Sequence, residues 1–575
     1  MASVEMASTT AFNATATATA RRLGSRIGRA LWAERITLAV AALALALRLW
    51  GINFGLPYAV HPDEPVVNGT VLHMMRVPTA NPDTFIYPSA LYYYLALIGV
   101  LYQGVTGHLI GSPPGTTGLG LYPNPDAILW MRVGVALLGV AAVAVVYRTA
   151  RALVGPWPAL GGALLLAFSP LHIIQSQIAT TDGVSATGIT LLAACCVLAV
   201  QTESRRAFWF AGIALGLAAG IKYNVAAGGV MLAAALGIVL WREHRRRPEA
   251  GWGVLRDSRL LALLIAPLAF LVTTPAALAT PGQFLNDVGG VFLHYDVRGH
   301  PGVAGSSLVY TLDELFRGNE TVLSVLACIG LAYALWRRHT ATLVVTAGLL
   351  AYFVLVAAPK VHFERNLVPL IPLLAILAAE GIAALAIVLA WASRLVTRWI
   401  QPERAAALVR SRWLHGGLLA AVLLIAALPT LTRTIQQDSI RSSPDVQATA
   451  SGWIDSHLPK GTRIAYESYS VTLNPGRFHL VYLRDGLYTQ PLAWYNEQHI
   501  QYVVASQMYY YRFFDAAPAD FPSERAAYAS MFSRWTVVRI WIGDNTDGGT
   551  PGGKIVLLRV TPPGTMAPHP VSPYP

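Results

Sequence analysis

Long apolar segments dominate this chain and alternate with short polar loops. A helix needs about 20 largely apolar residues to cross a membrane, and about eleven segments meet that requirement. They lie near residues 36–52, 128–147, 157–178, 183–201, 208–223, 225–241, 259–279, 320–336, 341–358, 366–392 and 415–433. The pattern predicts a polytopic α-helical membrane protein with about 11 transmembrane helices.

Arginines occupy every second loop between these segments, which is the distribution that the positive-inside rule requires. Residues 88–108 are also apolar, but a span there would place every later arginine-rich loop outside. We therefore predict an interfacial helix at 88–108, within a first external loop over 53–127. A second external loop covers 280–319. The N-terminus, with a disordered and basic segment over 1–35, is then cytoplasmic, and the C-terminus is extracytoplasmic.

The pattern changes after the last apolar segment, so residues 36–435 form the transmembrane domain and 436–562 form a separate domain. A helical pattern near 445–458 is followed by short alternating strands, which predict a small extracytoplasmic α/β domain. The strands are expected at 463–466, 478–483, 501–505, 536–541 and 554–560. The tail over 563–575 is rich in proline and predicted to be disordered.

The composition is also typical of a membrane protein. The 575 residues are 54% hydrophobic and only 13% charged, against about 25% charged in soluble domains. The net charge of +12 comes from arginines in the loops, so it indicates topology rather than nucleic-acid binding. Cys195, Cys196 and Cys328 all fall in apolar segments, which leaves no disulfide framework or zinc spacing.

Charged residues stand at the predicted outer ends of the helices. Asp63 and Glu64 follow the first segment, and Asp182 follows the third. Lys222 lies between the fifth and sixth segments, and Arg365 lies between the ninth and tenth. Each also has a structural interpretation: the acids as helix caps, Lys222 as a cation reaching toward headgroups, and Arg365 as the partner of Glu364.

Two arginines, Arg132 and Arg48, lie about one turn inside the outer boundary. They are further candidates for binding a donor phosphate, or structural cations that reach toward the headgroups. His61, Asp63 and Glu64 also leave a divalent metal site open, since histidine and carboxylates are ordinary ligands. Their spacing matches no metal signature, and the chemistry considered next requires no cofactor.

This inventory suits transfer of a sugar from a lipid phosphate. One carboxylate has to deprotonate the incoming hydroxyl, while the departing phosphate needs positive charge rather than a general acid. A hydrolase with paired carboxylates would place two acids across one bond. Cations outnumber the plausible acids at this surface, which favours transfer from a phospholipid carrier.

Several motifs occur in the order found in one known family. They are Leu49-Trp50-Gly51 with His61-Pro62-Asp63-Glu64, Pro170 with the run Ser176–Asp182, Gly212, Gly216 and Gly220 before Lys222, and Phe363-Glu364-Arg365-Asn366 running on to Pro372. The chain resembles the polytopic C-type-fold glycosyltransferases that use polyprenyl-phosphate sugars, a group that includes protein O-mannosyltransferases and the lipid A aminoarabinose transferase.

The resemblance implies that Asp63 is the general base, supported by Glu64, and that Asp182 lines the acceptor side. It implies that Lys222 and Arg365 hold the carrier phosphate. The expected protein is an integral plasma-membrane glycosyltransferase with inverting single-displacement chemistry. Its partners would be a polyprenyl-phosphate sugar donor, a protein, glycan or lipid acceptor, and membrane lipids, with no nucleic acid.

Two alternatives stay open at this stage. The rival function is a transporter or flippase, in which the same charges would line a path for a lipid-linked or anionic substrate. The polar cluster between Asn286 and His300 is either a solvated loop or a lid that contacts substrate.

Overall fold

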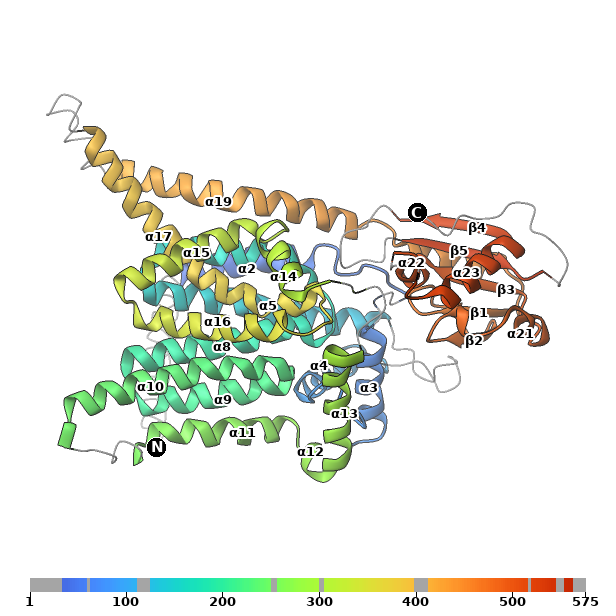
Figure 1. Cartoon of the computed structure of the whole chain (residues 1–575), viewed down its shortest axis with the longest axis horizontal. Helices are drawn as coiled ribbons and strands as arrows, with labels where there is room; N and C mark the ends of the chain where they lie inside the picture. The colour runs from blue at the N-terminus through green and yellow to red at the C-terminus, as the bar shows by residue number, and fades with distance from the viewer. Residues whose placement is uncertain are drawn as a thin grey trace, which may run out of the picture.

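The computed structural model describes residues 34–58, 61, 63–110, 125–249, 256–298, 303, 305–397, 412–515, 519–543 and 553–561. The predictions for the N-terminal segment before residue 34 and for the tail over 563–575 fall outside these residues. Helices make up most of the described chain, and a mixed sheet follows them (Figure 1).

The long helices form one bundle whose members run roughly side by side (Figure 1). Every apolar segment of the sequence contains at least part of one of them. They are α2 (Arg35–Leu49), α5 (Pro125–Val154), α6 (Pro156–Phe168), α8 (Thr181–Thr202), α9 (Arg205–Ile221), α10 (Gly229–Arg246), α11 (Ala262–Thr273), α15 (Thr321–Arg337), α16 (Thr340–Ala357), α17 (Leu370–Thr397) and α19 (Arg412–Arg441).

Not all of these helices are individually long enough to span a bilayer. By length and composition, five helices among the described residues qualify, or up to seven if each of two bent pairs counts as one span. In the first pair, α6 and α7 (Pro170–Ser176) bend by 58°, and in the second α14 (Ser307–Phe316) and α15 bend by 95°. The structure therefore supports a multi-pass membrane protein, and the count of about 11 spans stays a prediction.

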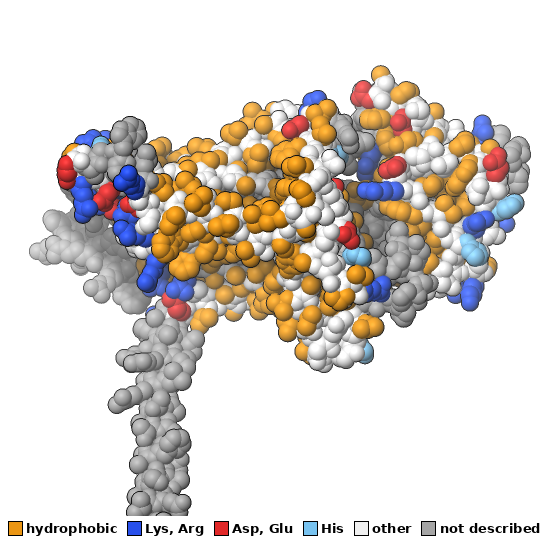
Figure 2. Space-filling view, turned by 90° about the horizontal axis from the view of Figure 1, so that it is seen from below, with side chains coloured by type: hydrophobic (Ala, Val, Ile, Leu, Met, Phe, Trp, Pro, Cys, Tyr) orange, Lys and Arg blue, Asp and Glu red, His pale blue; other side chains and the backbone are white. Residues whose placement is uncertain are grey.

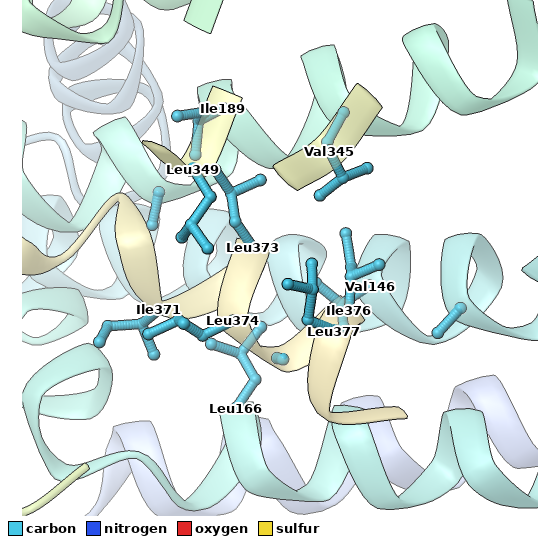
Figure 3. Packing of buried hydrophobic residues seen from close by; sticks show 14 of the residues in the cluster. Val146, Leu166, Ile189, Val345, Leu349, Ile371, Leu373, Leu374, Ile376 and Leu377 are labelled. Carbon is cyan, nitrogen blue, oxygen red and sulfur yellow. The ribbon is translucent and has the colours of Figure 1, made fainter. Parts of the chain in front are cut away.

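Helix α17 lies at the centre of the bundle. Its apolar side chains pack on several neighbours: Leu373 lies beside Leu349 of α16, Leu374 beside Leu166 of α6, and Leu377 beside Val146 of α5 (Figure 3). Helix α17 is therefore buried over much of its length, and the residues just before it are fixed relative to the other helices.

Glycines bring α9 and α11 into close contact. A Cβ atom on Gly212 would lie 2.5 Å from the carbonyl oxygen of Ala262, and one on Gly216 would collide with the carbonyl of Ala266. Small residues of this kind let membrane helices approach closely. The glycine spacing noted in the sequence therefore fixes the position of α9, and with it the residue that follows, Lys222.

Short helices cross one end of the bundle. Figure 1 shows α3 (Glu64–Arg76), α4 (Ala90–Thr106) and α13 (Pro281–Leu293) running across the direction of the long helices. The segment predicted to be interfacial, 88–108, is thus a 17-residue helix with this transverse orientation. The other short elements are η1 (Tyr223–Gly228), η3 (Ser258–Leu261), α12 (Ala276–Ala279), η4 (His294–Arg298) and η5 (Glu364–Leu367).

The sheet lies beyond this same end of the bundle (Figure 1). Its strand order is β2-β1-β3-β5-β4; β1 pairs in parallel with β2 and β3, while β5 is antiparallel to β3 and β4. The strands are β1 (Arg463–Glu467), β2 (His479–Leu483), β3 (Tyr502–Ser506), β4 (Thr536–Ile542) and β5 (Lys554–Arg559). The helices are α20 (Val446–His457), η6 (Leu487–Thr489), α21 (Leu492–Glu497), α22 (Gln507–Asp515) and α23 (Pro522–Arg534).

The surface separates apolar from charged regions. Figure 2 shows hydrophobic side chains over the middle of the bundle, and lysines and arginines gathered at the end away from the sheet. Helix α10, for example, ends with His244, Arg245 and Arg246. The transverse helices and the sheet therefore lie at the opposite end of the apolar belt from this basic cluster.

Candidate active site

Four charged residues meet at the end of the bundle that faces the sheet. Asp63 is the N-cap of α3, and Asp182 lies in the first turn of α8. Lys222 is the C-cap of α9, and Arg365 lies in η5, just before α17. We call Asp63, Asp182, Lys222 and Arg365 the charged cluster. Each member stands where a helix begins or ends, so the packing of the helices positions it.

The cluster consists of two ion pairs. Nη1 of Arg365 donates to Oδ2 of Asp63 over 2.7 Å, and the two side chains are 30% and 25% exposed. Nζ of Lys222 donates to Oδ1 of Asp182 over 2.5 Å, and there the exposed fractions are 13% and 5%. Lys222 also reaches Oδ1 of Asn366 at 3.4 Å. The more accessible carboxylate is therefore that of Asp63.

Charges of both signs act on the groups beside Asp63. Burial alone would lower the pKa of Arg365, but the anions of Asp63 and Asp182 outweigh it and raise this pKa above its usual value. Burial lowers the pKa of His61, only partly opposed by the charges of Asp63 and Glu64. Nδ1 of His61 accepts from the backbone N–H of Asp63 at 3.3 Å. We therefore treat Arg365 as a cation and His61 as a neutral ring at physiological pH.

Glu64 is in a different setting from its neighbour. It is fully buried, and Arg132 donates to both of its carboxylate oxygens, over 2.8 Å from Nε and 2.6 Å from Nη2. The backbone N–H of Ala179 donates to it as well. Burial would raise the pKa of Glu64, but Arg132 lowers it below the usual value. Glu64 is thus an ionised anchor for the start of α3.

Arg132 completes that anchor from α5. Its Nη1 donates to the carbonyl oxygens of Ile52 and Phe54, each over 2.8 Å. Like Glu64, Arg132 has no exposed surface, and its polar groups are occupied by protein. The structure therefore places Arg132 as a support for the loop before Asp63 rather than beside the charged cluster.

Arg48 also lies in the interior. It is fully buried, and its guanidinium contacts Nδ1 of His172 at 2.6 Å and the carbonyls of Ala44 and Ala167 at 3.0 and 3.3 Å. None of these partners belongs to the charged cluster. Of the four cations expected to hold a phosphate, the structure brings together Lys222 and Arg365 and separates Arg132 and Arg48 from them.

Aromatic residues lie around Arg365, one of them from its own motif. Its guanidinium lies 4.7 Å from the ring centroid of Phe363, and Tyr295 of η4 meets that ring edge-on at 6.3 Å. The hydroxyls of Tyr87 and Tyr295 also lie near Arg365. Tyr295 belongs to the polar cluster noted in the second external loop, whereas nothing in the local sequence marks Tyr87.

The two loops that the sequence predicts to be external hold each other in place. Oδ2 of Asp287 accepts from the backbone N–H of Phe85 at 2.8 Å, and the hydroxyl of Tyr223 donates to the carbonyl of Phe85 at 3.0 Å. The rings of Phe85 and Phe284 pack edge-on at 5.4 Å. Within the described part of the second loop, Asp287 therefore fixes one loop to the other. His300, at the end of the polar cluster, lies outside the described residues.

The described residues offer no metal site beside Asp63. Among the described residues, no group of three or more His, Cys, Asp or Glu side chains is arranged to hold a metal ion. His61, Asp63 and Glu64 are close in sequence, but Glu64 is turned away to Arg132. These three side chains do not form a common ligand set.

Comparisons with known proteins agree on the fold. A family profile described as dolichyl-phosphate-mannose-protein mannosyltransferase matches residues 126–271. No curated protein sequence matches the chain.

Among solved structures, the apo oligosaccharyltransferase of Archaeoglobus fulgidus matches with a TM-score of 0.56 at 12% identity, over 92% of this chain and 76% of that one. ArnT from Cupriavidus metallidurans bound to undecaprenyl phosphate matches with a TM-score of 0.52 at 17% identity, over 92% and 98%. The C-type glycosyltransferase fold expected from the sequence is confirmed.

Proposed function

We propose that this chain, which has the C-type glycosyltransferase fold, is an integral membrane glycosyltransferase that moves a monosaccharide from a polyprenyl-phosphate carrier to an extracytoplasmic acceptor. The observation that carries the proposal is the setting of Asp63. Its carboxylate is partly exposed and bound through one oxygen, in a cluster that also contains two cations. The family profile and the undecaprenyl phosphate bound to ArnT support the choice of donor class.

The reaction follows from what each side chain can do. Oδ1 of Asp63, which accepts no hydrogen bond from the described residues, accepts the proton of the acceptor hydroxyl while that hydroxyl's oxygen attacks the anomeric carbon. The bond from the anomeric carbon to the phosphate oxygen breaks, and its electron pair leaves with the polyprenyl phosphate. Because the attack occurs opposite the leaving group in a single displacement, the configuration at the anomeric carbon is inverted.

Arg365 and Lys222 provide the positive charge for the departing phosphate. Both are cations with fixed positions at helix ends, and preorganised charge of this kind stabilises a developing anion without rearrangement. In the resting structure each is paired with a carboxylate. The donor phosphate would therefore bind by sharing these cations with Asp63 and Asp182.

The orientation in the membrane follows from the distribution of charge. The basic ends of helices such as α10 would face the cytoplasm under the positive-inside rule. The charged cluster, the transverse helices and the sheet would then face the extracytoplasmic side. A donor in the outer leaflet would reach the cluster laterally from the membrane.

The test is transfer by the purified, detergent-solubilised full chain from a panel of radiolabelled polyprenyl-phosphate sugars, with membrane extract as the source of acceptor. We expect one donor to be consumed, and Asp63→Asn to lower the rate on the order of 10³-fold, within the range for loss of a general base. Arg317→Gln is the matched control, because this exposed arginine caps α14 and, among the described residues, forms an ion pair with Asp313 alone.

Two outcomes would contradict the proposal. Transfer that persists at the wild-type rate in Asp63→Asn would remove Asp63 from the reaction. Failure to consume any donor, combined with movement of a labelled lipid across liposomes that contain the protein, would replace the enzyme by a transporter.

A further inference from the structure

One buried arginine has no hydrogen-bond partner among the described residues. Arg441, the last residue of α19, is 2% exposed, and none of its three guanidinium nitrogens has a hydrogen-bond partner among the described residues. A buried charge is costly unless it is paired, and apolar replacements of similar volume are often neutral or stabilising at such positions. The carboxylates of Asp438, Glu64 and Asp445 are close enough to act on its charge, but none among the described residues is hydrogen-bonded to it, so stability alone does not account for an arginine here.

Arg441 contacts Phe54, which lies next to the residues that anchor Glu64. Its guanidinium carbon lies 4.1 Å from the ring centroid of Phe54, and that of Arg132 lies 3.9 Å from the same centroid. Arg132 in turn binds Glu64 and the carbonyl of Phe54. Phe54 thus joins the end of α19 to the anchor that holds the residue next to Asp63.

The whole turn around Phe54 is held between the bundle and the C-terminal domain. Phe54 forms a buried apolar cluster with Ile174 and Ile178 of the bundle, and Tyr58 and Ala448 of α20 pack against this cluster. We call residues 51–58 the catalytic-loop turn. Its last described residue, Tyr58, is five positions before Asp63, so the turn sets where the loop that carries Asp63 begins.

Glycines allow the catalytic-loop turn and the C-terminal domain to approach each other closely. Gly51 has a φ of +72°, and a Cβ atom there would lie 3.0 Å from Oγ of Ser442, directly after Arg441. A Cβ atom on Gly452 of α20 would lie 3.2 Å from the Tyr58 hydroxyl. The first residues of the C-terminal domain therefore touch both ends of the catalytic-loop turn.

From these contacts we infer that the C-terminal domain positions the catalytic carboxylate: Arg441 is a positioning residue that acts on Asp63 through Phe54, Arg132 and Glu64. The inference rests on the proposed function for Asp63. It assigns the C-terminal domain a role in the transfer step itself, in addition to any contact with the acceptor. Loss of the Arg441 contact loosens the turn, and misplacement of a reacting group by about 1 Å can cost on the order of 10²-fold in rate.

The experiment uses the full chain with Arg441→Met, which removes the charge and keeps an unbranched side chain of similar length. We expect kcat to fall about tenfold or more, with the KM for the donor unchanged and no loss of thermal stability. Arg441→Lys keeps the charge without the planar group that stacks on Phe54, so it should restore only part of kcat. Arg433→Met is the matched control, an exposed arginine on the same helix that bonds the carbonyl of Gly318.

Hydrogen exchange supplies a readout that does not depend on transfer. The backbone amides of residues 51–58 should exchange faster in Arg441→Met than in the wild type or Arg433→Met. If the wild type transfers no sugar, the proposed function fails, while faster exchange would still support the contact between the two domains.

Three results would overturn the inference. The first is wild-type kcat in Arg441→Met, and the second is unchanged exchange in residues 51–58. The third is a loss of the folded state in Arg441→Met, which would make Arg441 a structural residue rather than a positioning one.

Discussion

Asp63 and Glu64 are neighbours in the sequence, yet their carboxylates have opposite surroundings. Glu64 has no exposed surface and receives three hydrogen bonds, two from Arg132 and one from the amide of Ala179. Asp63 is 25% exposed and is held through one oxygen by Arg365. A group that must take a proton from a substrate needs a free lone pair, whereas a group that must hold a loop needs none. The pair divides these two roles between adjacent residues.

The largest effect should come from Glu64. Glu64→Gln leaves the guanidinium of Arg132 buried without its counter-charge, which costs about 3–5 kcal/mol of unfolding free energy. Asp63→Asn should cost only about 1 kcal/mol or less, because its ion pair is partly exposed. Denaturant or thermal unfolding of both variants in the same detergent measures the difference. Equal losses would mean that the two carboxylates do not have separate roles.

Arg365 should matter more to rate than to stability. Arg365→Gln removes the cation nearest Asp63 and should lower kcat/KM on the order of 10²-fold, as for loss of one preorganised donor to a developing anion. Arg365→Lys retains the charge without the planar fork and should lose less. Steady-state transfer kinetics compare the two variants. If both retain wild-type kcat/KM, the phosphate is held elsewhere.

Lys222 should have a smaller effect, expressed mainly in donor binding. Lys222→Met removes one of two cations and should raise the donor KM about tenfold, a change that corresponds to about 1.4 kcal/mol. Lys222→Arg keeps the charge beside Asp182 and serves as the control. A fall in kcat with an unchanged KM would instead place Lys222 at the transition state alone.

Glu467, at the end of β1, is a third carboxylate for this comparison. We expect its substitution to have the smallest effect of those considered. Like Glu64 it is buried, but its partners are the backbone N–H groups of Leu487 and Ser506 and the hydroxyl of Tyr528, with no guanidinium. Burial raises the pKa of Glu467 to about 7, against hydrogen bonds that lower it. Burial acts on the pKa of Glu64 in the same direction, but there Arg132 outweighs it.

The pKa shifts of Glu467 and Glu64 predict opposite changes of stability with pH. The pKa of Glu467 is raised on folding, so its contribution to stability is complete below about pH 4.5 and is lost as the pH rises through about 7. The pKa of Glu64 is lowered, so its contribution is present at neutral pH and is lost only in acid. Protection factors of the β1 amides should therefore be higher at pH 5 than at pH 8, and Glu467→Gln should flatten that difference. A difference that survives in Glu467→Gln would assign it to another group.

The sequence predicts the positions of the elements better than the contacts among the charges. Apolar runs locate the helices because each must be covered by lipid or by other helices. The strands predicted at 463–466 and 554–560 are present as β1 and β5, although their residues are buried on both faces rather than alternately. Motif order selects Asp63, Asp182, Lys222 and Arg365, which do come together.

The sequence does not predict which charged residues pair with each other within the site. The residues around Glu64 do not predict that its carboxylate turns inward to Arg132 while the carboxylate of Asp63 faces Arg365. Both arginines lie far away in the sequence. The burial of Arg48 beside His172 and the place of Tyr87 near Arg365 depend on how the helices pack. Those contacts are set by tertiary structure and have no local signature.

The close contact between α9 and α11 has a consequence for how this protein tolerates change. Gly212 and Gly216 face backbone carbonyls with no space for a methyl group, and Lys222 follows in the same helix. A mutation that enlarges either glycine would move Lys222 without altering any residue of the charged cluster. Under the proposed function, a change at this buried helix contact would therefore resemble a change in the charged cluster itself, and it would first be noticed as a change in donor use.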